Sequence, residues 1–209
     1  MEENVKEQPV YKIGKVKIKG EQLTVDFVED FVNANYHNDI TKSCQQIVHS
    51  DLKYALGLLK PHVVQICEMP EAKHINVADP SDEDLNERLK NYVVTGYSKG
   101  GDGESAGVTI IAQKLLSTGK VLNLTVPFMQ FADESGEGYP YGSELEEVIA
   151  RCDYEVDAYL FEEKWGIKQE TFDFDTPVES DITGTEELEP KKKSRKKKES
   201  VDEENRISA

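Results

Sequence analysis

A run of basic residues near the end of the chain has the clearest chemistry in the sequence. Seven of the eight residues at 191–198 are Lys or Arg, although the protein of 209 residues has a formal charge of −16. Clustered cationic side chains bind phosphate groups, with an affinity that falls as salt rises. The run therefore predicts either a tether to nucleic acid or a solubilising tail whose charge is offset by neighbouring acids. Its basic residues are Lys191, Lys192, Lys193, Arg195, Lys196, Lys197 and Lys198.

A second candidate site is the hexapeptide QETFDF at 169–174. It resembles the short peptides that bind bacterial sliding clamps, although Phe172 stands where leucine is usual. In such a peptide Gln169 would hydrogen-bond at the mouth of a pocket, while Phe172 and Phe174 would be buried anchors. The alternative is that the two phenylalanines pack the end of the folded region back onto itself.

The remaining polar residues form no catalytic or metal-binding signature. The glycine-rich segment 98–107 lacks the GK[ST] ending of a nucleotide loop and no helix follows it, so it predicts a hairpin loop. The histidines and cysteines show neither CxxC nor HxxxH spacing, which predicts structural histidines and reduced core thiols. We therefore expect a non-enzymatic protein without metal or cofactor. The residues concerned are His37, His49, His62, His74, Cys44, Cys67 and Cys152.

The acidic composition limits what the folded region can bind. Asp and Glu total 41 against 25 Lys and Arg. Such a body repels nucleic acid at long range unless its basic side chains gather on one face. The chain has no apolar run long enough to span a bilayer and no apolar signal segment at its start. We therefore expect a soluble protein in the cytoplasm of a bacterial host or in a virion, with no membrane partner.

Two changes of hydrophobic period predict the elements that position these residues. The alternating stretch KVKIKGEQLTVDF predicts a hairpin, followed by a third strand within residues 39–48. A helix with Ser50 as its N-cap follows to about residue 66, kinked or broken near Lys60 by Pro61. Three further strands are expected at 92–97, 108–116 and 121–131. A capping box at 143–146 then opens a helix that closes near Gly166.

This order predicts an α+β fold with antiparallel strands in a βββα-βββα arrangement and two amphipathic helices. One domain should cover residues 1–168, with a possible internal duplication of 10–67 and 90–166, and residues 169–209 should be a disordered tail. Helices on one face of the sheet would leave the other face exposed for binding. Tyr92, Tyr97 and Phe128 are the candidates for stacking on bases there.

Three stretches of the chain resemble a family of small proteins carried by bacteriophages and prophages. They are IVHSDLKYALGLLKPHV at 47–63, the strand region at 92–128, and CDYEVDAYLFEEKWG at 152–166. The resemblance implies a phage context and transfers no activity or site residues. We expect an accessory protein of phage DNA replication or recombination that binds single-stranded nucleic acid or a replication protein such as a sliding clamp. The alternative is a virion or host-factor-binding protein with no nucleic-acid role.

Overall fold

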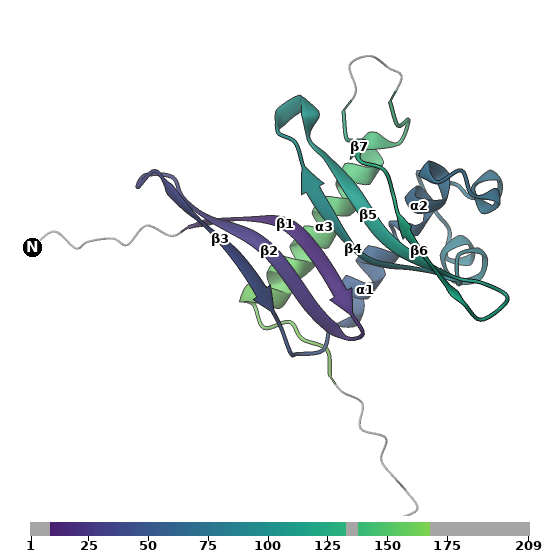
Figure 1. Ribbon diagram of the computed structural model, residues 1–209, viewed down its shortest axis with the longest axis horizontal. Helices are drawn as coiled ribbons and strands as arrows, with labels where there is room; N and C mark the ends of the chain where they lie inside the picture. Colours follow the sequence, from purple (N-terminus) through teal and green to yellow (C-terminus); the bar gives the residue numbers. More distant parts are fainter. Residues whose placement is uncertain (1–8, 133–137, 168–209) are drawn as a thin grey trace, which may run out of the picture. The chain divides into compact units, whose positions relative to one another are not determined.

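Seven strands form one antiparallel sheet in the computed structural model, which describes residues 9–132 and 138–167. The strand order is β3-β2-β1-β4-β5-β6, and the short β7 pairs with β5 beyond the end of β6 (Figure 1). The strands are β1 Val10–Lys19, β2 Gln22–Phe31, β3 Tyr36–Ser43, β4 Tyr92–Gly100, β5 Gly107–Leu115, β6 Val121–Thr125 and β7 Met129–Gln130. With the helices described next, the sheet confirms the α+β class.

The longer helices lie together on one side of the sheet in Figure 1. They are α1 Ser50–Gly57, α2 Lys60–Ile66 and α3 Gly142–Phe161, and three short helical turns lie at Pro70–His74, Asp84–Arg88 and Gly103–Ser105. Pro61 divides the first predicted helix in two, because a proline inside a helix lacks the amide donor and crowds the preceding turn. The exact βββα-βββα order is therefore not found, and the duplication of 10–67 and 90–166 stays a prediction. None of the helices in the described part of the chain is both long and apolar enough to cross a membrane.

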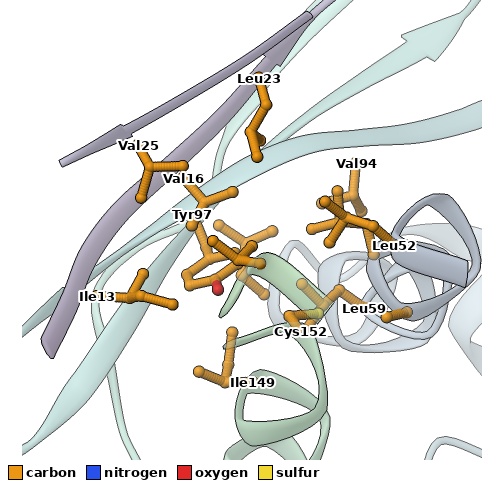
Figure 2. Packing of buried hydrophobic residues seen from close by; sticks show 14 of the residues in the cluster. Ile13, Val16, Leu23, Val25, Leu52, Leu59, Val94, Tyr97, Ile149 and Cys152 are labelled. Carbon is orange, nitrogen blue, oxygen red and sulfur yellow. The ribbon is translucent and has the colours of Figure 1, made fainter. Parts of the chain in front are cut away.

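The core forms where the inward residues of the strands meet α1, α2 and α3. In β1 and β2 every second residue is apolar, so that Val16, Leu23 and Val25 are fully buried while the intervening lysines of β1 are exposed. Figure 2 shows these side chains around Tyr97, facing helix residues that include Leu52, Leu59, Ile149 and Cys152. On the opposite face of the sheet no helix of residues 9–132 or 138–167 packs, and this face is called here the open face.

Several predicted boundaries are wrong for identifiable local reasons. The N-cap of α1 is His49 and not Ser50, because the His49 ring accepts the hydrogen bond from the Leu52 amide. The predicted capping box at 143–146 does not form, since the Ser143 hydroxyl donates to the adjacent Glu144 carboxylate. The third strand spans Tyr36–Ser43, so it begins before the predicted range 39–48 and ends within it. The extended segment 121–131 is interrupted between β6 and β7.

The last helix also ends earlier than expected, at Phe161 rather than near Gly166. Glu163 has a φ of 57°, and the Lys164 amide then donates to the carbonyl of Ala158. A left-handed residue with such a back-bond is the usual way to end a helix, here without glycine. The chain turns back so that Trp165 pairs with Val48.

The two halves of the sheet meet through a very short contact between β1 and β4. Only residues 15–17 of β1 pair with residues 96–98 of β4, a contact called here the seam. Gly96 is required there, because a Cβ atom on it would lie 2.1 Å from the carbonyl oxygen of Val16. Beyond the seam β1 and β4 diverge, as Figure 1 shows.

The seam gives a first prediction, on stability. Gly96→Ala should lower the free energy of unfolding by about 2–3 kcal/mol, because the new methyl group overpacks against backbone that cannot move without breaking strand pairs. Gly57→Ala is the matched control: a Cβ there meets nothing within 4 Å, and removing a helical glycine should stabilise the protein by about 1 kcal/mol. Urea denaturation followed by circular dichroism measures both changes, and equal effects of the two variants would contradict the role of the seam.

Candidate nucleic-acid interface

Four lysines project from β1 on the open face. Lys12, Lys15, Lys17 and Lys19, called here the lysine row, are all exposed and alternate with inward-facing apolar residues. A bulge at Gly14 keeps Lys12 and Lys15 on the same face although they are three residues apart. The row therefore places four ammonium groups along the central strand of an acidic protein.

The charge of the lysine row is compensated at one end only. Lys12 forms an ion pair of 2.7 Å with Asp30, and the neighbour of Lys15 on β2 is Asp26. Lys17 and Lys19 instead lie opposite Thr24 and Gln22, and neither forms an ion pair with any residue in 9–132 or 138–167. The Lys17–Lys19 end of the row therefore has no acidic cross-strand neighbour on β2.

Among the described residues, Phe128 offers an exposed aromatic ring on the open face. Phe128 is 44% exposed, and it lies over the paired glycines Gly100 and Gly107, which leave room for its ring. Tyr92 and Tyr97, the other predicted stacking residues, are at most 1% exposed and belong to the core. The prediction of stacking at these tyrosines was wrong, because both alternate into the helix-covered side of β4.

A cleft of about 450 Å³ opens where β1 and β4 diverge beyond the seam. Ile18 and Gly20 line its β1 side, residues 92–95 its β4 side, and Leu56 and Gly57 of α1 its floor. Its outer wall includes Val93, which is 54% exposed and points to the open face. The cleft therefore continues from the Lys17–Lys19 end of the row into the gap between the half-sheets.

Three lysines line this cleft. Lys60 is partly buried, and within the part of the chain that the structure describes its ammonium group donates one hydrogen bond, of 3.5 Å, to the carbonyl oxygen of Leu85. Burial lowers the pKa of Lys60, as expected for a cation removed from water without a carboxylate partner. Lys53 and Lys90 form only long ion pairs, of 3.7 and 3.6 Å, with exposed glutamates. Pairs of this kind are weak in water, so both lysines can turn toward a bound anion.

A separate charged cluster lies at the start of α1, and its chemistry argues against metal binding. His49, Asp51 and Glu155 place possible ligand atoms within 4.8 Å of one another. The Lys164 ammonium already binds both carboxylates, at 2.8 Å from Asp51 and 2.7 Å from Glu155, and these contacts raise the pKa of Lys164. Because His49 Nδ1 accepts from the Leu52 amide, the neutral ring keeps its proton on Nε2 and has no lone pair there for a metal.

The other predicted candidates have structural environments. His62 is 1% exposed and shares a 2.9 Å hydrogen bond with Tyr139, while His37 and His74 are exposed. Burial raises the pKa of all three cysteine thiols, that of Cys152 to about 12, which disfavours the reactive thiolate. The predicted hairpin loop within 98–107 is found at residues 101–106, between β4 and β5, and the amides of Asp102 and Ser105 bond within it.

The two motifs predicted beyond the fold lie outside the described residues. These are Gln169, Phe172 and Phe174 of the clamp-like peptide, and the basic run at 191–198. The alternation of KVKIK was enough to predict that its lysines share one face of a strand. We predicted only a hairpin from this alternation, and placed the phosphate-binding residues in the basic run at 191–198. Lys53 and Lys60 had no comparable signal, because nothing in the spacing of the predicted helix 50–66 indicates that Lys90, outside it, lines the same cleft.

Comparisons of the chain with family models, curated proteins and solved structures find no match. Its function therefore has to be inferred from the geometry of the described residues.

The burial of His62 gives a second prediction, on pH dependence. Desolvation lowers the pKa of His62 to about 4, below its ordinary 6.5. Between these values the unfolded chain binds a proton that the folded chain excludes, so stability is complete above pH 6.5 and falls toward pH 4. From pH 7 to pH 5 this group should cost about 2 kcal/mol, measured by urea denaturation at both pH values.

Two variants isolate that effect from the other titrating groups. His62→Gln should remove this part of the pH dependence, whereas Tyr139→Phe should keep it, because burial and not the hydrogen bond is the main cause of the low pKa. An unchanged pH dependence in His62→Gln would show that His62 is not buried in its neutral form.

Proposed function

We propose that the protein is a non-enzymatic binding protein for single-stranded nucleic acid, which lies along the lysine row on the open face of the sheet. The observation that carries the proposal is the gathering of Lys15, Lys17 and Lys19 beside the lysine-lined cleft of an otherwise acidic protein. Alternate residues of a strand are about 7 Å apart, a spacing that allows successive lysines to follow the phosphates of an extended strand. A role in phage DNA replication or recombination is part of the proposal.

The distribution of charge favours a single strand over a duplex. The lysines form one line, and Asp26 and Asp30 of β2 lie beside it on the same face. A second phosphate backbone alongside the first would meet these carboxylates, which repel it. A single strand needs only one line of cations and an apolar surface for its bases, which Phe128 and Val93 offer.

The acidic body and the basic run at 191–198 have distinct parts in this model. The acidic folded region repels the phosphates of a nucleic acid, so the binding of a single strand should be weak and strongly dependent on salt. The basic run adds affinity without choosing a target. Recruitment of a sliding clamp through Gln169, Phe172 and Phe174 is a further part of the proposal, independent of the lysine row.

The third prediction tests the row directly. The parent protein for this test is the full-length chain with the seven basic residues of 191–198 changed to Gln. In this background, the triple variant Lys15→Gln, Lys17→Gln and Lys19→Gln should lose most binding of a labelled oligothymidylate. The slope of log affinity against log salt concentration should fall by about 2, since each lost contact with a single strand contributes about 0.7. Fluorescence anisotropy at several salt concentrations measures both quantities.

The control is a triple variant with the same net charge. Lys42, Lys73 and Lys120 are exposed, line neither the row nor the cleft, and form no ion pair within residues 9–132 and 138–167. Changing them to Gln should leave the salt slope nearly unchanged. An equal loss in the two triple variants, or no binding by the parent protein, would overturn the proposal.

A further inference from the structure

We propose that the cleft between β1 and β4 is a binding site for the phosphate monoester of a nucleotide, such as the 5′-phosphorylated end of the bound strand. The inference deepens the proposed function and partly rests on it, because the end of a strand would reach the cleft from the Lys17–Lys19 end of the row. The same phosphate chemistry occurs in a free nucleoside monophosphate, which the experiment below distinguishes.

Lys60 is the cleft-lining lysine without a carboxylate partner among the described residues. It is a partly buried residue. A cation held out of water without a counter-ion is unfavourable, and an arriving phosphate removes that cost. Charge-assisted hydrogen bonds of this type are among the strongest in proteins.

The number of lysines around the cleft suits a monoester better than an internal phosphodiester. At neutral pH a phosphate monoester carries a charge of about −1.5 to −2, whereas a diester carries one negative charge. Lys53 and Lys90 line the same cleft as Lys60, and their present partners, Glu21 and Glu87, are exposed and distant. The cleft is therefore lined by more positive charge than one internal phosphodiester would neutralise.

The rest of the cleft suits the nucleoside attached to that phosphate. Ile18, Leu56 and Val94 supply apolar walls, and Val93 and Gln113 lie on its open-face side. A volume of about 450 Å³ falls within the range of pockets that hold small ligands. Gly57 keeps the floor clear, because a side chain at this position would extend into space that is otherwise empty.

The fourth prediction compares ligands that differ only in the terminal phosphate. The full-length protein should bind a 5′-phosphorylated oligothymidylate about tenfold more tightly than the same strand with a 5′-hydroxyl, in a competition assay read by anisotropy. Thymidine 5′-monophosphate alone should raise the melting temperature of the protein, whereas thymidine should not. Lys60→Met and Gly57→Leu should abolish both effects, the first by removing the cation and the second by filling the cleft.

Two matched variants show whether a loss of binding comes from the cleft or from a change in folding. Lys73→Met removes an exposed lysine elsewhere, and Gly57→Ala alters the same glycine while leaving the cleft open, so both should behave like the parent protein. Equal binding of the two strands with no response to thymidine monophosphate would overturn the inference and leave the proposed function standing. Binding of the monophosphate that depends on Lys60, without binding of either strand, would overturn the proposed function and support the site.

Discussion

The structure depends on the seam, where a hydrogen-bonded contact of three residue pairs joins two antiparallel half-sheets. By comparison, β1 pairs with β2 at nine positions and β4 with β5 at eight, so each half is strongly connected within itself. The absence of a side chain at Gly96 allows the close approach, and α1 and α3 support the junction from the helix side. Because the contact is short, the same strands that build the core also separate to form the cleft.

The lysine row and the core are two consequences of one alternation. Val16 and Ile18 face the helices, so Lys15, Lys17 and Lys19 must face the other way, and a shift of one residue would bury the lysines. The energy of burying apolar side chains therefore also fixes the position of the charges. The backbone that carries these lysines is a paired strand and is more rigid than a loop. Less backbone entropy is therefore lost when a ligand binds.

Local patterns in the sequence were enough to predict the class of fold and most of its elements. The two hairpins, the break at Pro61 and the last amphipathic helix all follow from spacing and turn residues. The errors occurred where one side chain had two possible hydrogen-bond partners. Ser143, for example, donates to Glu144 instead of capping a helix. The cleft was beyond prediction, because it forms only where β1 pairs with β4, which lies some 80 residues away in the chain.

The contrast between an acidic body and a basic interface has a consequence for specificity. Strong basic patches bind any polyanion, and their affinity changes little from one nucleic acid to another. Here Asp26 and Asp30 lie beside the lysine row, so that only a ligand narrow enough to follow β1 avoids their repulsion. In the same model, the partly buried Lys60 would favour a ligand whose charge is concentrated at one point. In the proposed model, weak general attraction combined with these two restrictions would select a strand by its width and by its end, without reading its bases.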